Sequence, residues 1–488
     1  MSPSPMQRSS ILIASLSIIL AGCASTFMPT EPAPILSKSF PKQFTAPTTQ
    51  NSSNESNYNE ASHSEIAAEW WRTFNDPQLN SLISQALSNS FSFQAAINRL
   101  QQSSAKATQA GASLSPTLNT TFDAERSMQT SDSTSTFQFG VMASYEIDLW
   151  SRLSATQQAA EFDYLASQQE LDVAAITLSS EIALSWYQAV TLNALIELYS
   201  QQLTVLDKQL EMLTLHHQYG QSNIEDIWQQ QQLQQAQQAK LLEAKSELKV
   251  IEQQLKVLTG ELSFALKDLP RLSTLPTMPN IGIPAQLLNQ RPDLKQAWFV
   301  VQSQQQNVVV AEADRYPQIK ITASLLSSST SISDLMSDWV SKLAGSILVP
   351  IIDGGARTAV IDEQQAVLNE YLNNYTQKVI EAISEVETAL TQEQSEHVQL
   401  SNIEQRLTLA SKTAQIKQLR YQNGSVDFLQ VLTAQQSELD LQQSQVESQG
   451  NLFALRIALH RSIAGNLNTF ESNTVDNQTT QSVEQDMD

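Results

Sequence analysis

Two long stretches without proline or glycine constrain the fold of this chain more than any other feature. They run from Arg152 to Tyr219 and from Thr358 to Asn423, about 67 residues each. Apolar residues recur in them at helical spacing, as at Leu171, Leu178 and Ile182. Because an α-helix rises 1.5 Å per residue, each stretch predicts a helix about 100 Å long. A helix of this length must lie beside similar helices, as in coiled coils.

The two stretches belong to an internal duplication, in which three short motifs recur in the same order about 200 residues apart. The motif pairs are Ser115-Pro116 with Tyr316-Pro317, Asp148 to Arg152 with Asp353 to Arg357, and Tyr219-Gly220 with Asn423-Gly424. Each half contains a helix, a proline, an extended hairpin, an Asp-x-x-x-Arg motif, a very long helix, a glycine turn and a helix. We therefore predict two repeats, at residues 66–270 and 271–465.

Glycine marks the point where each long helix must reverse direction. Gly220 and Gly424 follow the two stretches, and glycine readily adopts the left-handed conformation that ends a helix. Asn223 and Asp427 lie three residues farther on, and both residue types cap helix N-termini. Each half therefore predicts an antiparallel helical hairpin with its tip at the glycine.

The segments between the helices alternate apolar and polar residues with a period of two, which is typical of strands. The pattern is clearest at Phe139, Val141 and Tyr145. We predict four strands of about ten residues each, the length of a tilted transmembrane strand. The strands lie near residues 117–126, 136–147, 318–328 and 339–349, with a polar loop from Gln129 to Ser135 inside the first pair.

These strands predict an assembly of several chains. One such hairpin alone could lie on a soluble surface, but four in one chain favour a membrane. Four strands cannot close a membrane barrel, and open sheet edges do not occur in lipid. Several chains must therefore share the barrel, which gives eight, twelve or sixteen strands. Side chains fill an eight-stranded barrel, so three chains form the smallest conducting assembly.

The N-terminus predicts a cleaved signal that ends at the single cysteine. Arg8 precedes an apolar run from Ile11 to Leu20, which is too short to span a bilayer. The sequence Leu20-Ala21-Gly22-Cys23 resembles the bacterial lipobox, in which the cysteine receives a covalent lipid. We therefore expect a lipid on Cys23, and Ala24 after it favours sorting to the outer membrane.

The two ends of the chain have compositions unlike the repeats. We predict a signal peptide at residues 1–22 and a lipidated tether at residues 23–65, which is rich in proline, serine, threonine and asparagine. Residues 466–488 are polar and acidic without apolar periodicity, and we predict a disordered tail.

Several motifs, taken in order, resemble the TolC/OprM (NodT-type) family of outer-membrane efflux factors. They are Trp70-Trp71-x-x-Phe74-x-Asp76-Pro77-x-Leu79, Tyr145 through Arg152, Leu287-Leu288-x-x-Arg291-Pro292-Asp293 and Pro350-x-x-Asp353-Gly354-Gly355. The resemblance covers the chain from about Trp70 to Ile463 and includes the lipobox of the OprM branch.

The resemblance implies a mostly α-helical homotrimer with a small β part. Three chains of four strands would form a 12-stranded β-barrel in the outer membrane, and their helical hairpins a periplasmic α-barrel. The family docks onto a periplasmic adaptor protein and an inner-membrane pump, here expected to be of the RND type. The channel needs no cofactor, conducts exported solutes passively and opens by untwisting of its helical tips.

Tip residues of the family carry over in part. Gly220, Asp226, Tyr421 and Gly424 match its tip positions, which contact the adaptor and hold the closed state. Val426 stands where the family has an arginine, so the salt-linked lock does not carry over.

The pore constriction of the family also differs here. Gln430 and Thr433 occupy the positions of two pore aspartates, which removes the acidic ring. Asp427 and Glu225 are acidic residues nearby that could substitute.

Composition and motifs argue against other functions. A net charge of −22 disfavours nucleic acid, which requires a basic surface. The five histidines form no HExxH motif and have no cysteine partner, so we expect no metal site and no catalytic residues. Two alternatives remain: a type I protein-secretion duct, and a periplasmic coiled-coil scaffold lipoprotein that does not conduct. A scaffold has no use for four apolar-faced strands.

Overall fold

The computed structural model describes residues 44, 69–129, 132–279, 281 and 284–463, all within the unit Pro41–Asp488. The predicted signal peptide, Cys23 and the tail at 466–488 lie outside the described residues, as does the predicted tether apart from Phe44.

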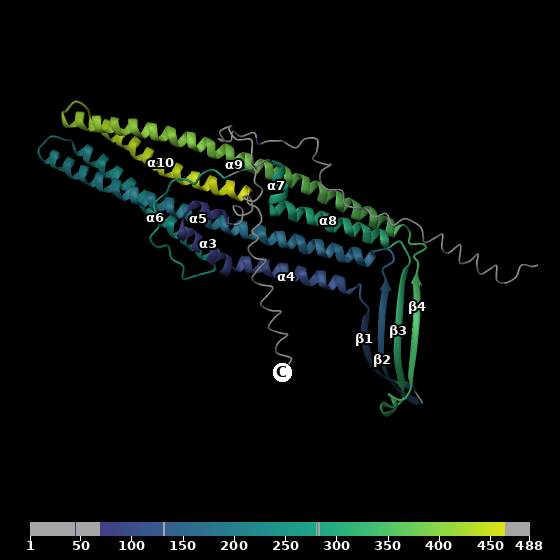
Figure 1. The fold of residues 1–488 in the computed structure, drawn as a ribbon. Coiled ribbons are helices and arrows are strands. Elements are labelled where there is room, and N and C mark those ends of the chain that lie inside the picture. The colour runs from purple at the N-terminus through teal and green to yellow at the C-terminus, as the bar shows by residue number, and fades with distance from the viewer. Residues whose placement is uncertain (1–43, 45–68, 130–131, 280, 282–283, 464–488) are drawn as a thin grey trace, which may run out of the picture. The chain divides into compact units, whose positions relative to one another are not determined.

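Helices form most of the described chain, and their order repeats in the two halves (Figure 1). The first half contains the 3-10 helix η2 (Trp70–Phe74) and the helices α3 (Pro77–Asn89), α4 (Phe91–Ala112), α5 (Arg152–Gln218) and α6 (Ile224–Thr259). The second half contains α7 (Pro284–Gln290), α8 (Pro292–Ala313), α9 (Ala356–Gln422) and α10 (Phe428–Ile463). Helices α5 and α9 have 67 residues each, which confirms the two long helices expected from the absence of proline and glycine.

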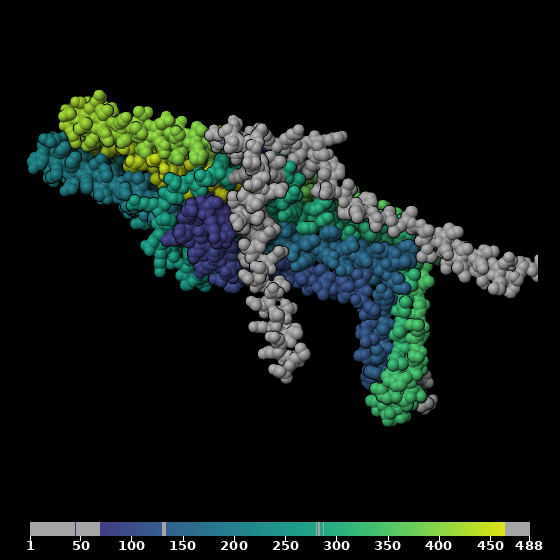
Figure 2. Space-filling view, in the orientation of Figure 1, coloured from purple at the N-terminus to yellow at the C-terminus, as the bar shows by residue number. Residues whose placement is uncertain are grey.

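The long helices pair as two antiparallel hairpins, α5 with α6 and α9 with α10, and α5 also packs against α10. Helix α4 packs on α5, and α8 packs on both α5 and α9. In Figure 2 the teal surface of the first hairpin and the yellow-green surface of the second lie against each other. The two halves are therefore joined by α8, by the α5–α10 contact and by the pairing of β2 with β3.

Four antiparallel strands form one sheet in the order β1-β2-β3-β4. The strands are β1 (Thr117–Gln129), β2 (Asp132–Ile147), β3 (Gln318–Ser329) and β4 (Trp339–Leu348), and the 3-10 helix η3 (Ile332–Asp334) lies between the last two. The predicted loop from Gln129 to Ser135 is wrong, because the β1–β2 pairing continues to Gln129 and Asp132. Backbone pairing needs no apolar side chains, so the ladder extends through the serines and threonines.

The main hydrophobic core joins the start of the described chain to both hairpins. Phe74 of η2 lies 5.3 Å from Tyr187 of α5 and 6.3 Å from Phe453 of α10, between ring centroids. Asp76 caps α3 by accepting hydrogen bonds from the main-chain N–H groups of its first turn. Its other carboxylate oxygen accepts a 2.8 Å hydrogen bond from the Trp186 indole. The Trp-Trp-Phe motif therefore fastens the first helices onto the middle of α5.

None of the helices built from described residues contains a segment with the length and hydropathy needed to cross a membrane.

Candidate functional site

The two helical tips have the same backbone geometry. Gly220 and Gly424 adopt left-handed φ angles of +71° and +67°, as predicted from their positions. In each tip the glycine N–H donates to the carbonyl three residues back, and the next N–H donates to the carbonyl five residues back. The pattern is a Schellman motif, which satisfies the last carbonyls of the helix. Both long helices therefore end in a defined turn.

Helices α6 and α10 begin at the N-cap positions predicted from the sequence, Asn223 and Asp427. Helix α6 starts directly after Asn223, whose N–H donates to Oδ2 of Asp226 at 3.3 Å. Helix α10 starts directly after Asp427, whose carbonyl accepts from the N–H of Gln430 at 3.1 Å. Asp226 thus stabilises the N-terminus of α6, where a carboxylate interacts favourably with the helix dipole.

Tyr421 and Asp226 connect the two tips. The Tyr421 hydroxyl donates to Oδ2 of Asp226 at 3.4 Å, although 195 residues separate them in sequence. Burial and the neighbouring Asp226 carboxylate raise the pKa of Tyr421 to about 12. The phenol therefore stays protonated at neutral pH and donates this bond. Resemblance alone selected these two residues, and the structure places them in contact.

An apolar cluster supports this contact. It combines residues from both hairpins and is separate from the main core: Leu213, Ile227, Phe428, Val431 and Leu432. Tyr421 packs on its edge, with its ring 5.2 Å from that of Phe428. Among the described residues, the tips of the two hairpins are therefore joined by a small apolar cluster and by the Tyr421–Asp226 hydrogen bond.

The candidate constriction residues lie near the tip, and the side chains of Gln430 and Thr433 bond to residues outside this set. Gln430 accepts a 2.6 Å hydrogen bond from Lys417 of α9. The Thr433 hydroxyl donates to the Leu429 carbonyl within α10, and Asp427 is exposed. Val426, which replaces the family arginine, is half-buried.

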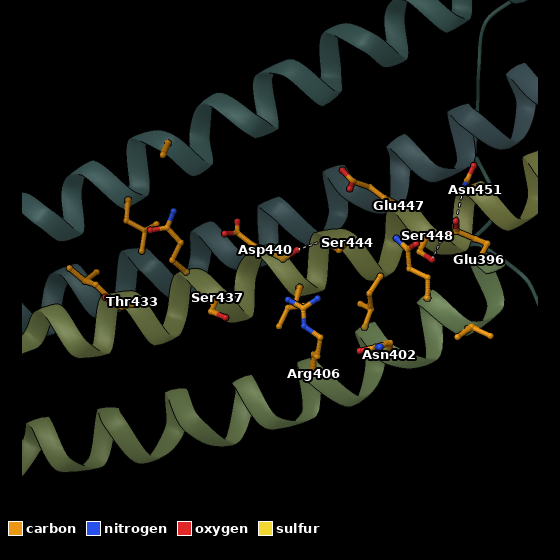
Figure 3. Close-up of a pocket in the computed structure, with 18 of the residues that line it drawn as sticks. Glu396, Asn402, Arg406, Thr433, Ser437, Asp440, Ser444, Glu447, Ser448 and Asn451 are labelled. Atoms are coloured by element: carbon orange, nitrogen blue, oxygen red, sulfur yellow. Dashed lines mark hydrogen bonds between the residues drawn. The ribbon is translucent and has the colours of Figure 1, made fainter. Parts of the chain in front are cut away.

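A groove of about 1390 Å³ runs between α6, α9 and α10 (Figure 3). Along α10 its lining includes a polar stripe with alternating spacings of four and three residues: Thr433, Ser437, Asp440, Ser444, Glu447 and Asn451. Across from this stripe, α9 contributes Asn402 and Arg406. The stripe was not identified from the sequence, although its heptad-like spacing of polar residues was a usable signal.

The sheet has one apolar face across all four strands. Directly paired residues lie on the same face of a sheet, and the row Leu118, Ala143, Ala323 and Leu343 is apolar throughout. The row on the opposite face, one residue along, is Asn119, Met142, Ser324 and Lys342. Leu118 and Leu343 are 72% and 77% exposed. The predicted strand alternation is therefore in register across the sheet and leaves its apolar face uncovered.

Each Asp-x-x-x-Arg motif marks a transition from strand to long helix. Asp148 accepts hydrogen bonds from the N–H groups of Leu153 and Ser154 at the start of α5, at 2.9 and 2.8 Å. Asp353 plays the same part for α9, accepting from the N–H of Arg357 and pairing with its guanidinium at 3.0 Å. The duplicated motif is therefore a duplicated helix cap.

Arg291 is buried and joins α8 to α9 through Glu385, a partner distant in sequence that the sequence analysis missed. Arg291, part of the Arg-Pro-Asp motif, holds Asp293 at 2.7 Å and Glu385 of α9 at 2.8 Å. Burial raises the pKa of Asp293, but the hydrogen bonds and charge of Arg291 outweigh it and lower that pKa below its ordinary value. No local pattern reveals Glu385 as a partner, because it comes from another helix.

No group of three or more potential metal ligands occurs among the described residues. Cys23, the predicted lipidation site, lies outside them.

Comparison with known proteins agrees with this geometry. The family model described as "Outer membrane efflux protein" matches residues 82–261 and 283–465. The pyoverdine export outer membrane protein OpmQ of Pseudomonas aeruginosa is 28% identical over 414 residues, covering 81% of this chain and 87% of its own. The probable outer membrane lipoprotein SilC of Salmonella typhimurium is 25% identical, covering 92% and 98%.

Solved structures show the same fold. The crystal structure of the outer membrane protein VceC from Vibrio cholerae matches with a TM-score of 0.74 and 24% identity, covering 82% of this chain and 99% of that one. Since the family model spans most of both repeats, the chain belongs to the outer membrane efflux protein family and acts in the outer membrane as the channel of an efflux system.

Proposed function

We propose that three copies of this chain form one channel, in which twelve strands close a β-barrel and the helical hairpins continue as an α-barrel into the periplasm. The supporting observation is the sheet with one apolar face, in which β1 and β4 each pair with a single strand among the described residues. Unpaired backbone groups cost several kcal/mol each in lipid. Both edges therefore require a neighbouring copy.

An assembly of three copies closes the barrel and also leaves a lumen through which solutes can pass. Two copies would give eight strands, whose interior side chains fill, whereas twelve leave a lumen. We infer passive conduction, with the energy supplied by a pump in the inner membrane. Members of this family are channels rather than enzymes, and we assign no catalytic residue and no cofactor.

We propose that the channel works with a periplasmic adaptor protein and an inner-membrane pump of the RND type. Gly220, Asp226, Tyr421 and Gly424 would form the tip that contacts the adaptor and opens. The small tip cluster and the single Tyr421–Asp226 hydrogen bond support this assignment, because so few contacts can separate at modest cost. Asp427, Gln430 and Thr433 are our candidates for lining the constriction when three tips meet.

We further propose that Cys23 carries a covalent lipid after removal of residues 1–22, followed by a tether at 23–65, repeats at 66–270 and 271–465, and an acidic tail at 466–488. The lipobox-like sequence supports this. The relative SilC is itself described as a lipoprotein.

The molecular mass of the detergent-extracted protein tests the proposed assembly. Light scattering should give about three times the mature chain, and the same fraction should conduct ions in planar bilayers. A monomer or dimer that conducts would contradict the proposal.

A Cys23→Ser variant separates the lipid from the barrel. It should lose lipid labelling yet still form the trimer, because twelve strands bury far more surface in the membrane than one lipidated residue. Complete loss of membrane insertion in this variant would count against the barrel.

A further inference from the structure

The two free edges of the sheet carry opposite charges on the same face. Lys342 of β4 lies in the same row as Asn119 of β1, through Ser324 and Met142. Asp123 of β1 lies four residues beyond Asn119, and Glu125 follows two residues later, so these carboxylates share the face of Lys342. All three charged side chains are exposed.

Within the described residues, none of these three charges forms an ion pair in its own chain. Lys320 of β3, on the same face, differs because it lies 3.5 Å from Glu146. The edge charges are therefore available to a neighbouring strand.

The two edge strands are also displaced relative to each other. The first residue of β4, Trp339, shares a row with Phe122, through Ser327 and Phe139. Strand β1 continues beyond this row to Gln129, whereas β4 continues in the other direction, past the start of β1. When β4 meets β1 of another copy, full pairing requires a shift of several residues toward Gln129. A shift in the other direction would leave most of β4 without a partner.

The tilt of strands in a membrane barrel sets the size of this shift. Strands lie about 4.8 Å apart and rise about 3.3 Å per residue, and they tilt by about 35–45°. Over the four strands of one copy, this tilt shifts β4 against β1 of the next copy by about four to six residues. An odd shift would place the apolar residues of one copy on the same side as the polar residues of the next. The shift is therefore four or six residues.

Both shifts bring Lys342 to an acidic residue of the next copy. A shift of four places Lys342 directly opposite Asp123, with Glu125 diagonal to it, and a shift of six exchanges the two carboxylates. On the apolar face, the shift of four also sets Leu343 beside Phe122 and Ile347 beside Leu118. The shift of four therefore pairs opposite charges on the polar face and apolar side chains on the apolar face.

We propose that Lys342 of one copy pairs with Asp123 of the next, and that this ion pair, with Glu125 beside it, sets the register of β4 on β1 where copies meet. This inference rests on the proposed trimer and adds its residue-level interface. Opposite charges on neighbouring strands stabilise pairing. Loss of one pair should weaken each interface roughly two- to fivefold, which over three interfaces multiplies to about tenfold to a hundredfold.

Charge reversal tests the pair. Lys342→Glu should lower the trimer's resistance to heat and detergent, and Lys342→Glu with Asp123→Lys should restore it. Lys320→Glu is the matched control, because its partner lies in the same chain, and Asp123→Lys should not rescue it. The pair is wrong if Lys342→Glu leaves trimer stability unchanged, or if the double reversal restores nothing.

Disulfide trapping tests the register without changing a charge. Ser346 and Asn119 face each other between copies for a shift of four, whereas Ser346 faces Thr121 for a shift of six. Within one chain these positions lie three strand spacings apart across the sheet, about 14 Å, and at least four residues apart along the strands, too far for a disulfide. The Ser346→Cys and Asn119→Cys pair should yield covalent trimers on a non-reducing gel. The pair with Thr121→Cys should not.

Two results would overturn the inference. Preferential cross-linking through Thr121→Cys would move the contact to Glu125, and cross-linking in neither pair would reject both registers. If the unsubstituted protein is not a trimer by light scattering, the proposed assembly itself fails, which is a separate and distinguishable result.

Discussion

Arg456 of α10 and Glu393 of α9 form an ion pair that is almost completely removed from solvent. Their side chains are 3% and 0% exposed. Arg456 Nε donates to Glu393 Oε2 at 3.0 Å, a second bond joins Nη2 to Oε1, and Nη1 donates to the Pro276 carbonyl. The pair therefore fastens both helices of the second hairpin to the segment that links the two halves.

Removing one partner of this pair should be costly. Arg456→Met leaves a buried carboxylate without its counterion, and we expect the free energy of unfolding to fall by about 3–5 kcal/mol. Glu393→Leu with Arg456→Met should recover most of the loss, because no charge remains buried. Urea unfolding followed by circular dichroism measures both. Arg271→Met is the control, since Arg271 and Glu197 are exposed and 3.7 Å apart; an equal effect in the two single variants would refute the prediction.

His460 should make the protein sensitive to mild acid. Burial, together with the positive charge of Arg456, lowers the pKa of His460 from 6.5 to about 4. The unfolded chain therefore binds a proton between pH 6.5 and 4 that the folded chain excludes. The contribution of neutral His460 to the free energy of unfolding is fully present above about pH 6.5. It declines as the pH falls toward 4, by about 3 kcal/mol in all.

A His460→Phe variant isolates this effect. Phenylalanine keeps the ring that stacks on Trp70 at 5.5 Å but cannot titrate. The unfolding midpoint of the variant should change less between pH 6.5 and 4 than that of the unsubstituted protein. His217→Gln, at an exposed histidine, should leave the pH profile as it was. Identical profiles in all three proteins would show that His460 does not control the acid response.

Replacing each of two helical glycines by alanine should change the stability of the protein in opposite directions. A Cβ on Gly450 of α10 would lie 2.3 Å from Oγ1 of Thr191 on α5, and overpacking of this kind costs about 1–3 kcal/mol. A Cβ on Gly111 of α4 would meet nothing closer than 3.5 Å. Gly111→Ala should therefore stabilise by about 0.5–1 kcal/mol through helix propensity.

Thr191→Ala provides the rescue for Gly450→Ala, because it removes the two nearest clashing atoms. Thermal unfolding of the single and double variants measures the effect. If Gly450→Ala and Gly111→Ala are equally stabilising, the α5–α10 contact is looser than described.

Tyr421→Phe should favour the open tip. The substitution removes the hydroxyl that donates to Asp226 but keeps the ring on Phe428. The loss of one partly exposed hydrogen bond costs about 1 kcal/mol, which shifts the ratio of open to closed channels about fivefold. Planar-bilayer recordings would show more frequent opening. Tyr219→Phe, at a tyrosine 78% exposed, should match the unsubstituted channel, and equal opening in both variants would contradict a role for Tyr421.

The parts of the fold that follow local rules were predictable from the sequence. The absence of proline and glycine predicted α5 and α9, and Gly220 and Gly424 predicted the turns because few other residues adopt a positive φ. The two-residue alternation predicted which strand residues share a face. The contact of Tyr421 with Asp226 needed the family resemblance, because nothing local connects residues so far apart.

The parts decided by tertiary contacts were not predictable. Glu393 resembles any carboxylate on a solvated helix until α10 places Arg456 beside it. The same holds for Gly450, whose packing role depends on Thr191 of another helix. The extra length of β1 and β2 was missed because their last pairs are polar, and hydrophobic alternation detects only strands that bury one face.

The equal lengths of α5 and α9 restrict how this chain can change its reach. One residue added to either helix would rotate everything beyond it by about 100° and advance it by 1.5 Å, so Tyr421 and Asp226 would no longer meet. Seven residues added to both helices, matched by seven in each return helix, would leave a rotation of only about 20°. The span across the periplasm can therefore lengthen or shorten in paired heptad steps, and a single insertion in one half would leave the two tips out of phase.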